Sequence, residues 1–329
     1  MLKKVNKIAV LTSGGDAPGM NAAIRAVVRT CSYHDVEVLG IYRGFQGMIE
    51  DDFVELNARS VRNIINKGGT FLKSARSEGF RTKEGRENAY NNLTKNGVEA
   101  LVVIGGDGTF TGALSFSQEF GFPVMGIPGT IDNDIYGTTY TLGYDTALNT
   151  VVEAIDKIRD TASSHNRMFF IEVMGRDAGF LALNSGIGGG AEKILIPEQH
   201  STLEELVSEI EVNHNKGKMS NIIVVAEGDT TGKNVFELKK YVEKQNPDYD
   251  IRVTVLGHIQ RGGAPTCFDR VLASRMGVKA VESLLEGKSN YMVGINNDKI
   301  DLTPLEKAIK GGESKLDPDL IRIAEIMSI

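Results

Sequence analysis

Residues 128–134, which read Pro-Gly-Thr-Ile-Asp-Asn-Asp, carry the residue types that phosphoryl transfer needs. The carboxylates of Asp132 and Asp134 stand two positions apart, close to the hydroxyl of Thr130. One carboxylate can accept the proton of a substrate hydroxyl while the other supports a metal ion or orients the substrate. A solvated acidic turn is the alternative interpretation. Two further glycine-rich turns upstream favour chemistry over that alternative.

These two turns have the composition of phosphate-binding loops. Residues 13–21 read Ser-Gly-Gly-Asp-Ala-Pro-Gly-Met-Asn, and residues 105–109 read Gly-Gly-Asp-Gly-Thr. Glycines after a strand let backbone N–H groups approach an anion, and a helix behind them adds a favourable dipole. Asp107 between glycines can hold Mg²⁺ through water. Because the second turn also occurs in lipid kinases and NAD kinases, it indicates nucleotide phosphate binding without fixing the other substrate.

Cationic side chains against the moving phosphoryl group are the next requirement, since charge develops there in the transition state. Arg76 and Arg176 are candidates for this role. Guanidinium groups also bind a phosphate on the substrate through paired hydrogen bonds. Candidates for that contact are Arg167, Arg252, His258 and Arg261, and Glu227 could accept hydrogen bonds from sugar hydroxyls.

The elements that must position these residues alternate between short apolar runs and amphipathic stretches. Such alternation predicts α/β units with a largely parallel sheet and helices on both faces. The glycine-rich turns follow three of the expected strands, and ligands collect at the carboxyl ends of such strands. The expected strands are 7–11, 36–42, 100–104, 124–127, 168–173, 221–226 and 252–256; the expected helices are 18–30, 109–120, 145–161, 202–215, 235–243 and 269–285. Pro18 suits the first position of its helix.

Length, charge and cysteine content exclude several classes of protein. The 329 residues predict about two domains, and 37 glycines without low-complexity sequence argue for ordered turns. A net charge of -6 excludes a nucleic-acid partner, since no domain-wide basic surface is available. The distant Cys31 and Cys267 are expected to be free thiols. Because no apolar run approaches about 18 residues, we expect no membrane segment and a cytoplasmic location.

Seven segments, in their order along the chain, resemble bacterial ATP-dependent 6-phosphofructokinases. They are TSGGDAPGMNA, GGTFLKSAR, VVIGGDGT, PGTIDND, RDTASSHNR, EVMGR and VLGHIQRGG, and the resemblance extends over nearly the whole chain. It implies the phosphofructokinase fold, with two Rossmann-like three-layer α/β/α domains, an active site in the cleft between them, and a homotetramer. The implied domains are 1–142 plus 259–310, which binds ATP, and 143–258 plus 311–329, which binds fructose 6-phosphate.

The resemblance also implies a role for individual residues. Asp132 would take the proton from the sugar 1-hydroxyl, Arg176 would stabilise the moving phosphoryl group, and Asp107 would hold Mg²⁺. ATP would be bound by Gly15, Arg76, Ser77, Gly106, Asp107, Gly108 and Thr109. Fructose 6-phosphate would be surrounded by Thr130, Asp132, Asp134, Met174, Gly175, Arg176, Glu227, His258 and Arg261, with Arg167 and Arg252 reaching in from a neighbouring subunit.

An effector site for an ADP- or phosphoenolpyruvate-type ligand is implied at a further group of residues. These are Arg25, Arg29, Arg159, Gly190, Glu192, Lys216 and Lys218. A solvated basic face is the alternative interpretation of any single pair. The chain also departs from the family at Ala58, where an effector-binding arginine is usual, with Arg59 one place later. The identity and strength of the effector therefore stay open.

Three other functions remain as alternatives to the ATP-dependent kinase. A pyrophosphate-dependent enzyme usually has Asp at the position of Gly108 and Lys at the position of Gly129, so both glycines favour ATP. A catalytically inactive nucleotide sensor would not need to keep Asp107, Asp132 and Asp134. The arginines and residues 128–134 count against a lipid or NAD kinase. A glycolytic kinase acting on fructose 6-phosphate is the function that the resemblance implies.

Overall fold

The structure of the chain is a computed structural model that describes residues 5–165, 167–199, 202–215, 221–228, 231, 234–247, 249–312 and 315–327. The chain divides into two units. The first comprises Met1–Ile131, Ile135–Thr146 and Arg261–Ser314; the second comprises Asp132–Asp134, Ala147–Gln260 and Lys315–Ile329. Each unit has its own sheet, so the α/β prediction with two domains of this class is confirmed. Which ligand each unit binds stays a prediction.

The first unit is built on a seven-stranded sheet with the strand order β11-β10-β5-β4-β1-β2-β3. Its central strands run parallel, whereas the two edge strands β3 and β11 are antiparallel to their neighbours. Antiparallel edges need only short connections, which the parallel core cannot use. The strands are β1 (Lys7–Thr12), β2 (Glu37–Ile41), β3 (Phe53–Leu56), β4 (Ala100–Gly105), β5 (Val124–Pro128), β10 (Tyr291–Asn296) and β11 (Lys299–Pro304).

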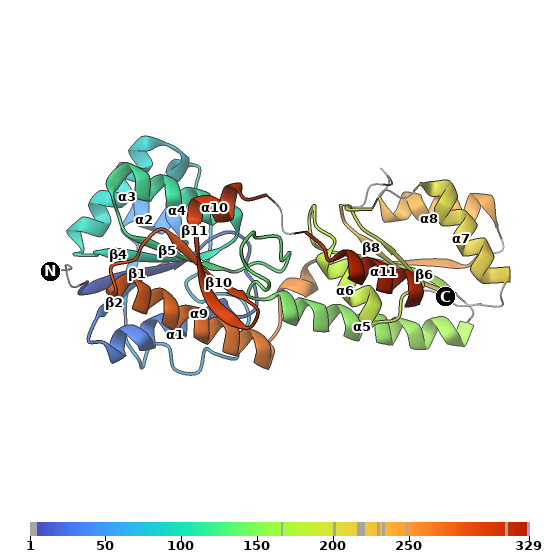
Figure 1. The fold of residues 1–329 in the computed structure, drawn as a ribbon, viewed down its shortest axis with the longest axis horizontal. Helices are drawn as coiled ribbons and strands as arrows, with labels where there is room; N and C mark the ends of the chain where they lie inside the picture. Colours follow the sequence, from blue (N-terminus) through green and yellow to red (C-terminus); the bar gives the residue numbers. More distant parts are fainter. Residues whose placement is uncertain are drawn as a thin grey trace. The chain divides into compact units, whose positions relative to one another are not determined.

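Helices cover both faces of this sheet, as Figure 1 shows. On one face, α1 and α9 pack together, and the other face carries α2, α3, α4 and α10. The central strand β4 is buried at all six positions, as expected of a parallel strand between two helical layers. The helices are α1 (Met20–Tyr33), α2 (Phe45–Glu50), α3 (Lys83–Lys95), α4 (Asp107–Phe120), α9 (Cys267–Leu285) and α10 (Leu305–Lys310), with a 3₁₀ turn at Gly79–Arg81.

The second unit has a four-stranded parallel sheet with the order β7-β8-β6-β9. Its apolar core joins these strands to α7 and α8 on one face, while α5, α6 and α11 lie on the other (Figure 1). The strands are β6 (Met168–Val173), β7 (Lys193–Leu195), β8 (Asn221–Ala226) and β9 (Ile251–Val255). The helices are α5 (Tyr144–His165), α6 (Phe180–Gly188), α7 (Leu203–Asn215), α8 (Val235–Gln245) and α11 (Pro318–Met327), with a 3₁₀ helix at Gly257–Arg261.

The start of α1 differs from the prediction. Pro18 was expected at the first helical position, but the helix begins at Met20 and Gly19 is its N-cap residue. The φ of Gly19 is 101°, in the left-handed region, so the backbone turns between the proline and the helix. Pro18 therefore belongs to the glycine-rich turn and not to α1.

Two further observations concern the described residues. Cys31 and Cys267 are both free thiols, the first buried and the second exposed. None of the helices that the structure describes combines the length and apolar character that crossing a bilayer requires.

Candidate active site

The three glycine-rich turns of the sequence lie at the carboxyl ends of adjacent strands in the first unit. They follow β1, β4 and β5, which are neighbours in the sheet. Backbone hydrogen bonds join the turns: the Ser13 N–H donates to the Ile104 carbonyl and the Gly129 N–H to the Gly105 carbonyl, both at 3.0 Å. The turns therefore form one connected surface at this edge of the sheet.

The turn after β4 leads directly into α4. Gly106 is the N-cap residue of the helix and, being glycine, has no side chain that could cap the N–H groups. Asp107 and Gly108 are exposed in the first turn, whereas Thr109 is buried. The N–H groups of an uncapped helix N-terminus and the helix dipole together favour a phosphate ligand. This end of α4 can therefore bind an anionic group of a nucleotide.

Residues 128–134, here called the catalytic segment, are held against their surroundings by backbone contacts. Gly129 forms a β-bridge with Leu142, and the Leu142 N–H donates to the Pro128 carbonyl at 2.9 Å. The Thr141 hydroxyl donates to the Thr130 carbonyl at 2.6 Å. Asp132 is only 6% exposed, which is unusual for an aspartate. Its burial and the fixed backbone suit a general base more than a solvated turn.

A second loop of the first unit carries Arg76 and Ser77. The Ser77 hydroxyl donates to the Gln46 side chain at 2.8 Å, and Arg76 is exposed. Upstream, the buried amide of Asn21 donates to the carbonyls of Lys67 and Gly68, both at 3.1 Å, and accepts from the N–H of residue 71. Asn21 thus ties the turn after β1 to this loop. The sequence interpretation gave it no role, although it lies in the first quoted segment.

Arg261 lies next to the same turn. Its Nη1 atom is 3.0 Å from the position that a Cβ of Gly15 would occupy. Any side chain at position 15 would displace the guanidinium group, so the glycine permits this close approach. The structure therefore brings together two residues that the sequence assigned to different ligands.

In the second unit, the expected sugar-binding residues gather at the carboxyl ends of β6 and β8. Glu227 accepts hydrogen bonds from the N–H groups of Gly175 at 3.3 Å and Arg176 at 2.7 Å. Gln260 is fully buried and accepts from the Met174 N–H at 3.2 Å. One oxygen of Glu227 orders the backbone that follows β6, and its expected contact with sugar hydroxyls stays a prediction. Gln260 was missed, although it lies within the quoted HIQRGG segment.

Arg167 and Arg252 lie at the opposite, amino ends of β6 and β9. Both guanidinium groups pair with Asp250, at 2.8 Å for Arg167 Nε and 3.0 Å for Arg252 Nη2. The hydrogen bond from the Arg167 guanidinium is the main cause that lowers the pKa of Asp250 from its ordinary value. At about 3.3 Å per residue, Arg167 lies about 20 Å along the sheet from Val173 at the carboxyl end of β6, and Arg252, which pairs with Phe169, lies about 13 Å from it. Within one chain, these arginines are therefore remote from Met174 and His258.

The comparisons with known proteins agree on one family. The family model described as Phosphofructokinase matches residues 7–284. The chain is 52% identical over 325 residues to the ATP-dependent 6-phosphofructokinase 2 of Bacteroides thetaiotaomicron, covering 99% of both chains. It is 53% identical to the ATP-dependent 6-phosphofructokinase 1 of Thermus thermophilus, covering 99% of this chain and 100% of that one.

The chain belongs to the phosphofructokinase family.

A solved structure of phosphofructokinase from Saccharomyces cerevisiae supports the same assignment. It superposes with a TM-score of 0.89 at 36% identity, covering 99% of this chain and 48% of that chain. The present chain thus spans about half the length of the yeast chain. Fold and family are shared over almost every residue described above.

The residues that the phosphofructokinase resemblance assigns to an effector fall into separate groups. In the second unit, Arg159 donates to the Gly189 and Gly190 carbonyls and pairs with Glu192 at 3.2 Å. In the first unit, Arg25 and Arg29 lie one turn apart on α1. Burial and, to a smaller extent, the charge of Arg29 lower the pKa of Arg25. Ala58 and Arg59 are exposed. Lys216 and Lys218 lie outside the described residues.

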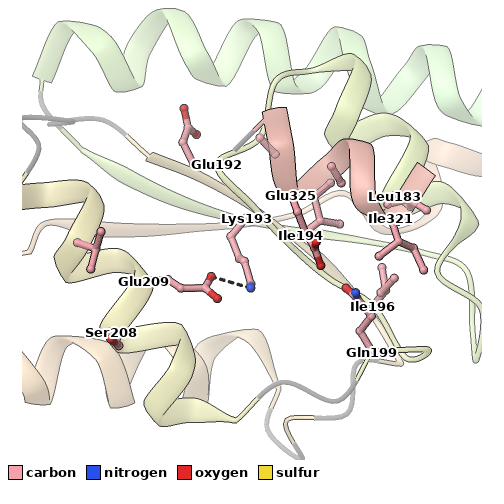
Figure 2. Close-up of a pocket in the computed structure, with 13 residues that line it drawn as sticks. Leu183, Glu192, Lys193, Ile194, Ile196, Gln199, Ser208, Glu209, Ile321 and Glu325 are labelled. Carbon is pink, nitrogen blue, oxygen red and sulfur yellow. Dashed lines mark ion pairs between the residues drawn. The ribbon is translucent and has the colours of Figure 1, made fainter. Parts of the chain in front are cut away.

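A cavity of about 370 Å³ lies elsewhere in the second unit, along the edge strand β7 (Figure 2). The ion pair between Lys193 and Glu209, at 2.6 Å, stands within it. Aliphatic side chains from β7, α6 and α11 make up much of the wall, including Ile194, Leu183 and Ile321. Glu192 is the one residue of the wall that the sequence assigned to a ligand. The cavity is separate from the expected catalytic residues.

Proposed function

We propose that this chain transfers the γ-phosphoryl group of ATP to the 1-hydroxyl of fructose 6-phosphate, giving fructose 1,6-bisphosphate and ADP. This is the committed step of glycolysis. The relatives that are 52–53% identical over nearly the whole chain are named ATP-dependent 6-phosphofructokinases. The observation in this chain that carries the proposal is a buried Asp132 in a hydrogen-bonded segment beside the turn that leads into α4.

The first part of the mechanism is the binding of ATP phosphates. The N-terminus of α4, with Gly106, Gly108 and Thr109, supplies N–H groups and the helix dipole. Gly15, Arg76 and Ser77 complete the contacts to the nucleotide. The only carboxylate among these ATP contacts is Asp107, and no group of three or more His, Cys, Asp or Glu that could hold a metal ion occurs in the described part of the chain.

This composition fits Mg²⁺, which usually keeps several waters and is held by one or two carboxylates together with substrate phosphates. Asp107 is the residue that would hold it. When bound, the ion supplies positive charge against the phosphate oxygens. A cage of protein ligands is not needed for this chemistry.

The second part is proton removal from the sugar. Asp132 accepts the proton of the 1-hydroxyl as the oxygen attacks the γ-phosphorus, while Thr130 and Asp134 orient the substrate. Arg176 stabilises the charge of the moving phosphoryl group. The backbone beside Arg176 is fixed by the Glu227 carboxylate, which places the guanidinium on a rigid support.

The sugar phosphate is recognised by its charge. Met174, Gly175 and Glu227 would contact the sugar, and His258 and Arg261 would bind the 6-phosphate. Arg167 and Arg252 would complete this site in a neighbouring subunit of a homotetramer. Their position towards the amino ends of β6 and β9, about 20 Å along the sheet from the carboxyl end of β6 for Arg167 and about 13 Å for Arg252, supports a contribution to another chain's site.

ATP is favoured over pyrophosphate by the surroundings of Gly108. A Cβ at this position would meet nothing within 4 Å, so the space is open to a ligand. An aspartate there would occupy this space with negative charge and repel a nucleotide phosphate. Gly129 is different, because a Cβ would lie 3.2 Å from Met20 Cε. Gly108 therefore favours ATP more strongly than Gly129 does.

Regulation and location follow the family resemblance. An effector of the ADP or phosphoenolpyruvate type would bind Arg25, Arg29, Arg159, Gly190, Glu192, Lys216 and Lys218. The pair formed by Arg159 and Glu192 supports part of this site, since it fixes the guanidinium group near Gly190. We place the enzyme in the cytoplasm, where glycolysis occurs.

The decisive test is a coupled assay of the purified protein with ATP, Mg²⁺ and fructose 6-phosphate, repeated with pyrophosphate as the donor. We expect fructose 1,6-bisphosphate with ATP and at most a trace with pyrophosphate. Faster turnover with pyrophosphate would overturn the choice of donor. No turnover with either donor would favour a nucleotide sensor. Repeating the ATP assay with ADP and with phosphoenolpyruvate tests the effector site.

A further inference from the structure

A buried carboxylate in the first turn of α9 lies at the junction of three loops and has no role in the mechanism above. Asp269 is 0% exposed. It accepts hydrogen bonds at 2.9 Å from the N–H of Gly143 and from the N–H of Thr146, and a third from the Thr146 hydroxyl. The Thr146 hydroxyl accepts in turn from the Thr266 N–H at 3.0 Å. Thr266 is the N-cap residue of α9 itself.

These bonds make Asp269 a cap for a helix to which it does not belong. Helix α5 begins at Tyr144, so the N–H groups of Gly143 and Thr146 are among those that no carbonyl of the helix can accept. A carboxylate at this end of a helix also interacts favourably with the dipole. Asp269 therefore fixes the first turn of α5 on α9.

The turn before α5 is confined from its other side by the glycine-rich turn after β1. Gly143 has a φ of 96°, and a Cβ on it would lie 2.8 Å from the Ala17 Cβ and 3.0 Å from the Pro18 Cδ. Only glycine adopts this conformation readily and fits this space. The position of Gly143 is thus set by Asp269 on one side and by residues 17–18 on the other.

The catalytic segment is attached to the residues just before Gly143. Leu142 forms the bridge to Gly129 and donates to the Pro128 carbonyl, and Thr141 donates to the Thr130 carbonyl. Thr130 precedes Asp132 by two residues. An unbroken series of contacts therefore connects the carboxylate of Asp269 to the backbone of the proposed base.

We infer that Asp269 is a positioning residue for phosphoryl transfer, which holds the catalytic segment in place through the capped turn of residues 141–146. The inference rests on the proposed function for its reaction, but the contacts from Asp269 to Thr130 lie wholly within the described residues of the first unit. A positional error of about 1 Å at a reacting group can cost about a hundredfold in rate. Loss of the Asp269 carboxylate should therefore lower kcat more than it weakens substrate binding.

The energetics of the group agree with a role in positioning. Burial raises the pKa of Asp269 to about 6, although hydrogen bonds from Thr146 and Gly143 act in the opposite direction. Burial thus makes the ionised form costly. The hydrogen bonds from Gly143 and Thr146 offset part of this cost and fix the carboxylate in one position.

The main test compares Asp269→Asn with the wild type in steady-state kinetics. The amide keeps the shape but can accept at one atom only, so one of the two N–H groups loses its acceptor. We expect kcat to fall about tenfold or more, with the KM values for ATP and fructose 6-phosphate within about threefold. Leu93→Ala, which removes a fully buried side chain of α3 far along the chain from this junction, is the control for general destabilisation.

A second pair of variants keeps the inference falsifiable if Asp269→Asn does not fold. Thr146→Val removes the hydroxyl that bonds to Asp269, and Thr146→Ser retains it. We expect the serine variant to keep most of the wild-type kcat and the valine variant to lose several-fold. Equal kcat values for the two variants, or a wild-type kcat in folded Asp269→Asn, would overturn the positioning role.

Amide hydrogen exchange separates this inference from the proposed function, because it needs no substrate. In Asp269→Asn, exchange should accelerate in residues 128–134 and 139–146 and not in the strands of the second unit. If the wild type fails to phosphorylate fructose 6-phosphate while this local change occurs, the function is wrong and the structural link stands. If the wild type is active and exchange in residues 128–134 is unchanged, the positioning role is wrong.

Discussion

The catalytic segment and the pair of Arg167 and Arg252 differ in how they hold their charged groups. Asp132 is buried, and the backbone around it is fixed by a bridge and by hydrogen bonds to carbonyl groups. The two arginines are partly exposed and are held by the single carboxylate of Asp250. A base must meet one proton with accurate geometry, whereas an arginine offers several N–H groups on a long side chain to the oxygens of a phosphate. The difference matches the tasks that we propose for them.

The strongest test of this comparison is Asp132→Ser. Removing a general base costs at least about a hundredfold in kcat, because the substrate hydroxyl must then lose its proton to water. The KM for ATP should change little. Steady-state kinetics with fructose 6-phosphate measure both values.

Asp301→Ser is a matched control, since Asp301 is exposed on β11 and has no proposed role. It should behave like the wild type. If kcat fell less than tenfold in a folded Asp132→Ser protein, Asp132 would not be the base. The proposed difference between the two regions would then be wrong.

The corresponding change in the second region is Arg167→Ser. Losing charged hydrogen bonds to a phosphate costs about 1.5–3 kcal/mol, which raises the KM for fructose 6-phosphate by about tenfold to a hundredfold. The KM for ATP should stay within about twofold. Initial rates with each substrate varied in turn give the two constants.

The control for this variant is Arg322→Ser in α11, which removes an exposed arginine that also pairs with an aspartate, at 2.7 Å. We expect no effect on either KM. If Arg167→Ser raised the KM for ATP and left that for the sugar phosphate unchanged, the proposed task of the exposed arginines would be wrong.

Gly108→Asp sharpens the comparison on the nucleotide side. The open space at Gly108 accepts a larger side chain without disturbing the fold, so the effect should come from charge against the nucleotide phosphates. We expect kcat/KM for ATP to fall about tenfold. Gly108→Ala adds bulk without charge and should lose less. An equal fall of kcat/KM for ATP in both variants would mean that the size of the side chain at position 108, and not its charge, determines the choice of phosphoryl donor.

The last prediction concerns the free energy of unfolding and its dependence on pH. We expect it to have the smallest effect on turnover. The folded pKa of Asp269, about 6, is above its ordinary value of 3.8. Its stabilising contribution is therefore complete below pH 3.8 and is lost as the pH rises through about 6. The difference in free energy of unfolding between wild type and Asp269→Asn should shrink by about 3 kcal/mol over this window, because a tenfold change in proton affinity corresponds to about 1.36 kcal/mol.

Thermal unfolding of both proteins between about pH 4 and pH 7.5 measures this change. The Asp145 carboxylate also raises the pKa of Asp269, so Asp145→Asn is expected to reduce the change slightly. A difference between wild type and Asp269→Asn that does not vary with pH would show that burial does not raise this pKa.

Sequence patterns predicted β1, β2, β4, β5, β6, β8 and β9 within one or two residues but missed β10, which lies between β5 and β11 in the sheet. Continuous apolar runs mark β1, β4, β5, β6 and β8 because such strands are covered on both faces. The edge strands β3, β7 and β11 were missed, since they are short and partly exposed and so lack this signal. Five helices were also missed, namely α2, α3, α6, α10 and α11; none of the described residues of α11 is buried.

For the candidate site, residue type and spacing indicated the groups that do chemistry but not those that support them. Asp250 and Asp269 look like ordinary aspartates in the sequence, because a supporting role depends on neighbours distant along the chain. Asp269 is more than 120 residues from the amides that it caps. The assignment of individual ligand contacts stays a prediction from the family resemblance.

The opposite placement of residues along β6 has a consequence for binding equilibria. If Arg167 and Arg252 complete the sugar-phosphate site of another subunit, each chain alone binds fructose 6-phosphate weakly. Dilution of the enzyme would then lower its apparent affinity for the sugar, and the sugar would in turn promote assembly by the same free energy. The concentration of the protein would thus regulate its activity, because the six-residue strand β6 separates these arginines from the sugar-phosphate site of their own chain.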